Sequence, residues 1–275
     1  MPTSSSYQLF CLRLTGTAPG KWQGEIRATQ GKISVSKTLT FEVLPLLLPT
    51  QTAPTLELWQ YPFAVARYYQ IEPKDYFNKA HCERIADLAI GQPHLGDQTV
   101  FRQWCEQRRT KGLATSIYNC VGDYPAMFLY SHPLESQWVI WNTVAYGADG
   151  FLRWALDAWV KDPLVNGSHW YWESGDPFLL YPGTNGTMMS LRFQQMQQAL
   201  NDSRKHLFLQ NKQPALVSEV TRLLDGWAQL SGETNDYGAQ VPFSENETLQ
   251  LIQTIQQMHD LLEKGARAYL KESNK

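Results

Sequence analysis

Tryptophans and carboxylates alternate between Tyr118 and Pro182, and this stretch holds the residues that could bind a sugar. Six of the ten tryptophans of the 275-residue chain fall in it, with acidic residues between them. A flat aromatic ring packs against the C–H face of a sugar, and a carboxylate accepts hydrogen bonds from its hydroxyl groups. The pattern favours a carbohydrate ligand, whereas a tryptophan-rich core with acidic loop tips is the alternative. The aromatic loop from Pro163 to Gly183 favours the ligand, because loops of that length are usually functional.

Three acidic residues in this stretch are candidates for catalysis, namely Asp157, Glu173 and Asp176. Glycoside hydrolysis needs a proton donor at the leaving oxygen and charge stabilisation at the sugar. Glu173 follows a tryptophan, and an apolar wall of that kind raises the pKa of a carboxyl group toward that of a general acid. The alternative is that Glu173 and Asp176 only shape the loop, by capping or by pairing with Arg153 or Arg192. The candidate substrate-binding residues are Trp59, Tyr118, Asn119, Tyr124, Trp154, Trp159, Trp172 and Tyr181.

The composition is that of a folded protein with no sign of a nucleic-acid or membrane partner. Apolar residues make up 43% of the chain and charged residues 18%, and 275 residues can bury a substantial core. A net charge of −2 offers no basic excess to neutralise phosphates. The apolar run Leu44–Pro49 is too short to span a bilayer, and no signal peptide is evident. We therefore expect a cytoplasmic protein with reduced cysteines.

Motifs for metals and cofactors are missing from the sequence. The four cysteines show no CxxC spacing, and histidines such as His132 and His169 show no paired spacing of metal ligands. No P-loop or GxGxxG fingerprint follows a predicted strand, and no GxSxG motif supports a serine nucleophile. We expect neither a metal nor a cofactor.

The chain divides into three predicted parts, with boundaries near residues 49 and 188. Residues 1–49 are predicted to form strands of a partial β-sandwich, at 7–14, 21–29 and 32–44, separated by turn signals. Residues 50–188 alternate between the two kinds of element, which is typical of βαβ units and a parallel sheet. The predicted strands there are 56–61, 87–91, 113–118 and 149–156, and the helices are 74–84, 99–111 and 134–146.

Polar or aromatic residues follow these strands, and the carboxyl ends of parallel strands usually face the site. The residues concerned are Tyr61, His94, Asn119 and Asp157. Residues 189–275 are predicted to be helical, with a first helix over 190–200, a second from Leu216 to Leu230 and a third that a capping box opens at Ser244–Glu247. The apolar stripe of the third helix is Leu251, Ile255, Met258 and Leu262.

Three motifs resemble those of glycoside hydrolase family 123-like proteins, whose C-terminal region is catalogued as domain of unknown function 4091. They are YNCVGDYP at 118–125, GADGFLRW at 147–154 and GDPFLLYPG at 175–183. Upstream, residues 39–49 resemble the strand that leaves the family's β-sandwich, and 56–62 its first barrel strand. The resemblance implies a β-sandwich followed by a (β/α)8 barrel. It also implies an amino-sugar ligand and hydrolysis of β-linked N-acetylgalactosamine, in which the substrate's own amide assists an adjacent Asp-Glu pair.

The chain departs from this plan in two respects. A (β/α)8 barrel takes about 250 residues and at least roughly 200, whereas only about 145 separate Leu56 from Asn201. No Asp-Glu dipeptide occurs in the sequence, and the family's pair would lie in the missing middle. We predict an α/β fold with an incomplete (β/α) barrel of about four strand–helix units, preceded by a small partial β-sandwich and followed by C-terminal helices.

The predicted function is a family 123-like sugar-binding domain that lacks the catalytic pair, and the alternatives are a glycosidase with a rearranged site or a remnant protein. An incomplete barrel has two open sheet edges, which a homodimer or the C-terminal helices could cover.

Overall fold

The computed structural model describes two compact units, one made of Met1–Leu47 with Ala266–Lys275 and the other of Leu48–Gly265. The three-part division predicted from the sequence stays a prediction. Within these units the described residues are 18–48, 55–58, 70, 89–91, 95, 97–119, 124–184, 186–228 and 243–273.

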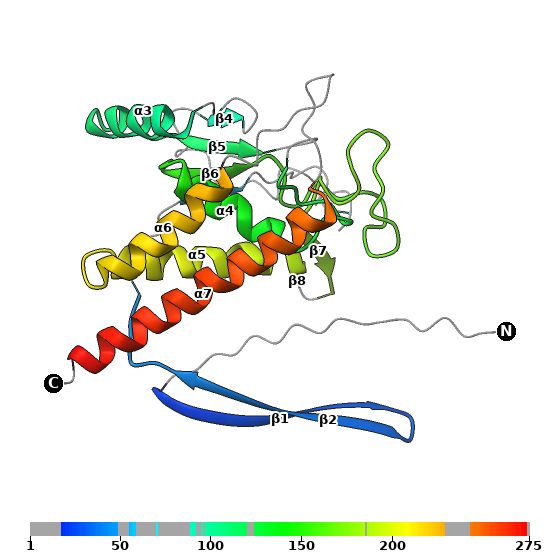
Figure 1. Ribbon diagram of the computed structural model, residues 1–275. Coiled ribbons are helices and arrows are strands. Elements are labelled where there is room, and N and C mark those ends of the chain that lie inside the picture. Colours follow the sequence, from blue (N-terminus) through cyan, green and yellow to red (C-terminus); the bar gives the residue numbers. More distant parts are fainter. Residues whose placement is uncertain are drawn as a thin grey trace. The chain divides into compact units, whose positions relative to one another are not determined.

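The smaller unit contains an antiparallel ribbon of β1 (Gly20–Gln30) and β2 (Ile33–Val43) (Figure 1). Gly31 adopts φ +60° in the connecting turn, a conformation that favours glycine. Trp22 of β1 lies opposite Phe41 of β2, and its side chain is 46% exposed. The ribbon confirms the strands predicted at 21–29 and 32–44, and the predicted strand at 7–14 lies outside the described residues.

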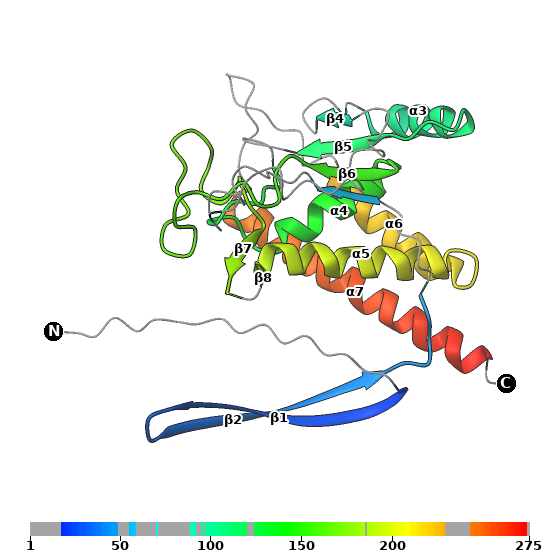
Figure 2. The same ribbon diagram turned by 180° about the vertical axis from the view of Figure 1, so that it is seen from behind.

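The larger unit is built on a four-stranded parallel sheet, as the alternation of elements predicted. Its strands follow the order β3-β6-β5-β4, so that the first strand along the chain pairs with the last (Figure 2). Among the described residues this sheet is open and does not close into a barrel. The strands are β3 (Thr55–Leu58), β4 (Ala89–Gly91), β5 (Ser116–Asn119) and β6 (Gly150–Arg153).

Helix α3 (Gln98–Thr110) confirms the helix predicted at 99–111. The Asp97 side chain caps its start by accepting a hydrogen bond from the Val100 N–H at 2.9 Å. The sequence predicts that Val100, Phe101, Trp104 and Cys105 share one face of this helix, and Phe101 is buried, but Val100 is 65% exposed. That part of the predicted face is wrong, because Val100 lies in the first turn, beside the cap.

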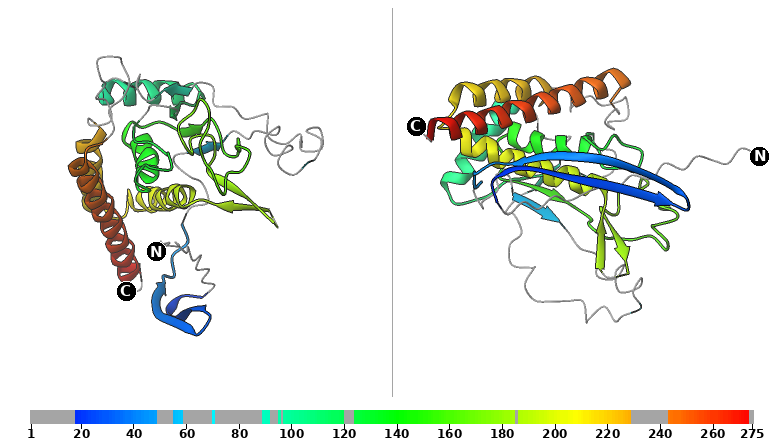
Figure 3. Two further views of the ribbon diagram at one scale, coloured as in Figure 1. Left: turned by 90° about the vertical axis from the view of Figure 1, so that its right-hand side faces the viewer. Right: turned by 90° about the horizontal axis from the view of Figure 1, so that it is seen from below.

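Helix α4 (Glu135–Ala145) lies at the centre of the larger unit. The helical spacing of Trp138, Trp141 and Ala145 predicts an amphipathic helix, but all residues of α4 except Val144 are buried. The reason is that α4 packs on β5 and β6 and also on two of the C-terminal helices (Figure 3). Gly147, with φ +66°, follows its last turn, as the sequence predicted.

The three predicted C-terminal helices are confirmed, and the first of them is longer than predicted. They are α5 (Leu191–Leu209), α6 (Pro214–Ala228) and α7 (Glu245–Ser273), and the stripe predicted on α7 from Leu251 to Leu262 is buried. The capping box is confirmed, because the Ser244 N–H donates to Glu247 Oε2 at 2.7 Å and the Glu247 N–H to Ser244 Oγ at 3.2 Å. Within the described parts of the chain, no helix combines the length and apolarity needed to cross a bilayer.

A short hairpin of β7 (Leu180–Gly183) and β8 (Gly186–Met189) precedes α5 and was missed in the sequence (Figure 1). Each strand has only four residues, too few to establish an alternating pattern. The hairpin ends at Ser190, whose side chain caps α5 by accepting from the Phe193 N–H at 3.1 Å.

Candidate functional site

The predicted site residues gather where β5 and β6 end and where the loop that follows β6 returns to the sheet. Asn119 is the last residue of β5 and Arg153 the last of β6. Figure 1 shows the long loop after β6 on the side toward which β5 points. Ligand sites of parallel sheets form at this end of the strands.

A buried ion pair between Arg153 and Asp176 joins the end of β6 to the returning loop. The exposed fractions of the two side chains are 0% and 1%. Arg153 Nη2 donates to both the carbonyl oxygen and Oδ1 of Asp176, and Nη1 donates to the Asn119 carbonyl oxygen at 3.0 Å. The Trp154 Nε1–H donates to Asp176 Oδ2 at 2.8 Å. Both carboxylate oxygens of Asp176 are therefore engaged, and its pairing with Arg153 is the loop-shaping arrangement that the sequence left open.

Arg192, in the first turn of α5, binds carbonyl oxygens of the same loop and of the segment that precedes α4. Its Nη1 donates to the carbonyl oxygens of Met127 and Gly175, the latter at 2.7 Å, and Nη2 donates to that of Phe178 at 2.8 Å. Burial lowers the pKa of Arg192 to about 10. A Cβ atom at Gly175, whose φ is +83°, would lie 2.5 Å from Leu129 Cγ and 2.9 Å from Arg192 Nη1. Glycine is required here because loop and arginine approach so closely.

Asp157 does not end a strand, contrary to the prediction. Strand β6 stops at Arg153, and Asp157 forms an isolated antiparallel bridge with Phe178. Its side chain is 3% exposed. The strand is shorter than its apolar sequence indicated, because the chain after Arg153 turns to pair with the returning loop.

Trp159 and Tyr181 pack around Phe178 in a small core. Trp159 is buried, and its Nε1–H donates to the Leu180 carbonyl oxygen at 2.8 Å. The rings of Phe178 and Tyr181 meet edge to face, with centroids 5.3 Å apart. Of the remaining candidates, Tyr118 is half-buried on β5, Asn119 is buried and donates to the Pro125 carbonyl oxygen at 3.0 Å, and Trp59 lies outside the described residues.

Glu173 is exposed and belongs to a chain of hydrogen bonds with two tyrosines. The Tyr130 hydroxyl donates to Glu173 Oε2 at 2.9 Å, and Tyr124 is hydrogen-bonded to Tyr130. Partial burial and the bond to Glu173 raise the pKa of Tyr130, and burial raises the pKa of Tyr124. Both hydroxyls therefore stay protonated at neutral pH, and the single proton of Tyr130 is donated to Glu173.

Three aromatic rings lead from the end of the sheet to the surface, and we call Trp154, Trp172 and Tyr171 the aromatic ladder. The guanidinium of Arg153 lies 6.0 Å from the Trp154 ring centroid. The centroids of Trp154 and Trp172 are 5.1 Å apart, and those of Trp172 and Tyr171 are 4.4 Å apart. Trp154 is buried, Trp172 is half-buried and Tyr171 is exposed, so the outer rings offer faces to a ligand.

Two residues of this region were missed in the sequence. Tyr130 connects Tyr124 to Glu173, and Glu135 is a buried carboxylate at the start of α4. Glu135 accepts from the N–H groups of Ala126 at 2.9 Å and His132 at 3.1 Å, and burial raises its pKa. Glu135 is the first residue of α4, where an acidic side chain is favourable, whereas nothing in the sequence singled out Tyr130.

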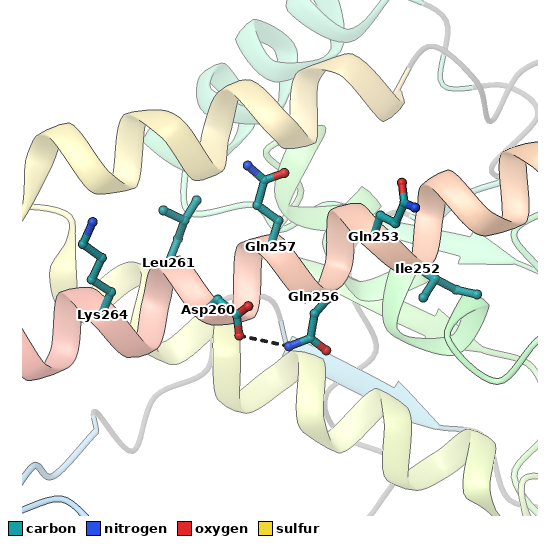
Figure 4. Close-up of a pocket in the computed structure, with 7 residues that line it drawn as sticks. All are labelled: Ile252, Gln253, Gln256, Gln257, Asp260, Leu261 and Lys264. Atoms are coloured by element: carbon teal, nitrogen blue, oxygen red, sulfur yellow. Dashed lines mark hydrogen bonds between the residues drawn. The ribbon is translucent and has the colours of Figure 1, made fainter.

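A cavity of about 520 Å³ lies on the surface of α7, lined by residues from Ile252 to Lys264 (Figure 4). Gln256 Nε2 donates to Asp260 Oδ1 at 2.9 Å along its wall. It contains none of the predicted site residues. In the described part of the chain no group of three or more histidine, cysteine or acidic side chains is arranged to hold a metal ion.

Comparison with known proteins supports the family resemblance that the motifs indicated. Residues 74–209 match the family described as glycoside hydrolase 123, catalytic domain. This chain is glycoside hydrolase family 123-like. A structure of a family 123 glycoside hydrolase from Clostridium perfringens, studied for glycolipid glycan hydrolysis, resembles it with a TM-score of 0.78 and 19% identity. The likeness covers 94% of this chain and 78% of that chain. No curated protein sequence matches the chain. The resemblance inferred from the motifs is confirmed, and the structural likeness extends to the fold.

Proposed function

We propose that this glycoside hydrolase family 123-like domain binds an amino sugar on its aromatic ladder and does not cleave glycosidic bonds. The observation that carries the proposal is how the three candidate acids are buried and bonded. Asp176 is locked to Arg153 and Trp154, and Asp157 is buried in the bridge to Phe178, so only Glu173 faces solvent. A glycosidase needs two groups acting on opposite sides of the bond or an assisting acetamido group held by a second acid.

The sheet order supports a barrel that lacks its middle. In a closed barrel the first strand pairs with the last, and here β3 pairs with β6. Only about thirty residues separate β3 from β4, which is the length of a single crossover between parallel strands. The family's Asp-Glu pair would fall in the omitted part, and the sequence contains no such dipeptide.

The residues that remain suit sugar recognition. Trp172 offers a ring face for C–H contacts, and the Glu173 carboxylate and the Tyr130 hydroxyl oxygen accept hydrogen bonds from sugar hydroxyls. The relative from Clostridium perfringens supports a carbohydrate ligand, since its study concerns a glycan.

Isothermal titration calorimetry with methyl β-N-acetylgalactosaminide tests this proposal. We expect millimolar or tighter binding that Trp172→Ala weakens about tenfold, the value of one aromatic contact. Trp22→Ala, which removes a partly exposed tryptophan from the smaller unit, is the matched control and leaves binding unchanged. No heat of binding at millimolar sugar would contradict the proposal.

The second candidate function is a glycosidase that uses Glu173 as its acid, and the exposure of Glu173 beside Trp172 favours it. An aryl β-N-acetylgalactosaminide distinguishes the two functions. Our proposal expects no release of the aryl group. Turnover that is present in the unaltered protein and lost in Glu173→Gln would establish the enzyme instead.

The homodimer and the cytoplasmic location stay predictions. Light scattering coupled to gel filtration tests the first, because a second copy covering the open sheet edges would double the mass of 31.5 kDa.

A further inference from the structure

We propose that the loop tip formed by His169, Trp170 and Tyr171 is an outer subsite that holds the second sugar of an oligosaccharide. This inference rests on the proposed function, because it assumes that the first sugar lies on Trp172. It adds His169 and Trp170 to the site, since Tyr171 already belongs to the aromatic ladder.

The tip displays two large aromatic side chains to solvent. Trp170 is 89% exposed and Tyr171 is 65% exposed. Single exposed apolar residues are ordinary on protein surfaces, but two adjacent aromatic residues at the end of a loop mark a contact site.

Hydrogen bonds fix the tip in place. His169 Nδ1 accepts from the N–H groups of Tyr171 at 3.1 Å and Trp172 at 3.0 Å, so this nitrogen is unprotonated. Just upstream, the Asn166 side chain accepts from the Ser168 N–H at 2.9 Å. Two backbone groups bound by one imidazole define the path of the chain, and a preformed tip loses little entropy when a ligand binds.

Ring contacts join the tip to the aromatic ladder. The His169 ring lies at 26° to the Trp172 ring, with centroids 6.3 Å apart, and at 31° to the Trp170 ring, with centroids 5.7 Å apart. Trp170 also lies 5.4 Å from Tyr171, centroid to centroid. A chain of sugars that begins on Trp172 therefore meets the Trp170 ring next.

The chemistry of the surroundings favours a sugar over other occupants. Glu173 and the Tyr130 hydroxyl lie on the same loop surface and are hydrogen-bonded to each other at 2.9 Å. Polar groups of this kind beside a ring match the hydroxyls and the C–H face of a pyranose.

Calorimetry with a monosaccharide and a trisaccharide, both ending in β-N-acetylgalactosamine, tests the outer subsite. We expect the trisaccharide to bind the unaltered protein about tenfold more tightly than the monosaccharide, the gain from one further aromatic contact. Trp170→Ala should abolish this gain and leave the monosaccharide affinity unchanged. Val165→Ala, at an exposed apolar residue of the same loop, is the control and should preserve both affinities.

Variants of His169 test the support of the tip. His169→Ala removes the acceptor and should reduce the gain as Trp170→Ala does, whereas His169→Asn provides an acceptor at a similar place and should restore most of it. If His169 only supported folding, its substitution would alter the affinities for the monosaccharide and the trisaccharide together.

The outcomes separate this inference from the proposed function. Binding of the monosaccharide with no gain for the trisaccharide overturns the outer subsite and leaves the first site intact. Failure of both sugars to bind overturns both proposals. Binding of the protein to phosphatidylcholine vesicles without sugar, lost in Trp170→Ala, would show that the tip is a membrane contact and would also overturn the subsite.

Discussion

Two parts of the loop after β6 contain the same kinds of residue and use them in opposite ways. Around Asp176 the carboxylate, the indole and the arginine are buried, and both carboxylate oxygens accept hydrogen bonds from the other two groups. Around Glu173 the carboxylate and the ring of Tyr171 are exposed, and the carboxylate accepts a hydrogen bond from the exposed Tyr130. Acidic and aromatic residues in one motif therefore do not indicate one function, since burial decides whether a carboxylate holds the fold or meets a ligand.

This comparison predicts that substituting a buried residue lowers the free energy of unfolding more than substituting an exposed one. The largest effect is expected for Asp176→Asn, which keeps the shape of the side chain but leaves the charge of Arg153 unpaired in a buried place. Removing one partner of such a pair costs about 3 to 5 kcal/mol. Urea unfolding measures the change in free energy of unfolding. Asp162→Asn, at an exposed residue of the same loop, is the control, and a loss below 1 kcal/mol at Asp176 would contradict the role assigned to the pair.

A smaller loss is expected for Arg192→Lys. Lysine carries the charge but not the planar fork that reaches three carbonyl oxygens, so at least one buried carbonyl loses its partner at a cost of about 2 kcal/mol. The same unfolding experiment measures it. If Arg192→Lys left the free energy of unfolding unchanged, water would have to replace the missing donors.

The sequence predicted those parts of the fold that depend on local patterns. The alternation of strands and helices predicted the parallel sheet, and the Ser244–Glu247 pair predicted the start of α7. Patterns of apolar residues predicted the helix at 134–146 but not that α4 is buried on nearly every side, because the elements packed around it decide that. These patterns failed at Asp157, where pairing with Phe178, a contact between distant residues, ended the strand early.

The sequence predicted several residues that lie at the site but not what each of them does there. The motif at 175–183 drew attention to Asp176, and two arginines were possible partners. The choice of Arg153 depends on how the loop folds back over 23 residues, which residue types and spacing do not specify. Likewise, the difference between the core position of Trp159 and the exposed position of Trp170 arises from packing around Phe178.

Charged side chains of α5 and α7 form a partly buried network, and its contribution to stability should depend on pH. Asp202 is 2% exposed and His259 is 35% exposed, and His259 Nδ1 lies 3.0 Å from Asp202 Oδ2. The hydrogen bond to Asp202 raises the pKa of His259 above 6.5. Burial alone would raise the pKa of Asp202, but the bond to His259 and the charge of Lys205 outweigh it and lower the pKa. Glu263 on α7 also contacts Lys205.

The signs of these shifts predict a maximum of stability between the two pKa values. The contribution of His259 is present below its ordinary pKa and is lost as pH rises through the raised value, whereas that of Asp202 is lost as pH falls through its lowered value. Since His259 is partly exposed, the alkaline loss should be about 1 kcal/mol or less. Unfolding measured from pH 6 to 9 should show this loss in the unaltered protein and not in His259→Gln. An equal slope in both would exclude His259 as its cause.

The smallest effect is expected for Glu173→Gln, because an exposed side chain that supports nothing buried changes stability by no more than about 0.5 kcal/mol. The substitution has a second readout at Tyr130. Burial, the largest cause of its raised pKa, remains, but the contribution of the Glu173 carboxylate is removed, so the pKa falls toward its ordinary value of 10. Ultraviolet titration of the phenols measures the shift, with Tyr130→Phe identifying the signal. If Glu173→Gln instead destabilised the protein as strongly as Asp176→Asn, the exposed loop would be structural, and the distinction between the two carboxylates would fail.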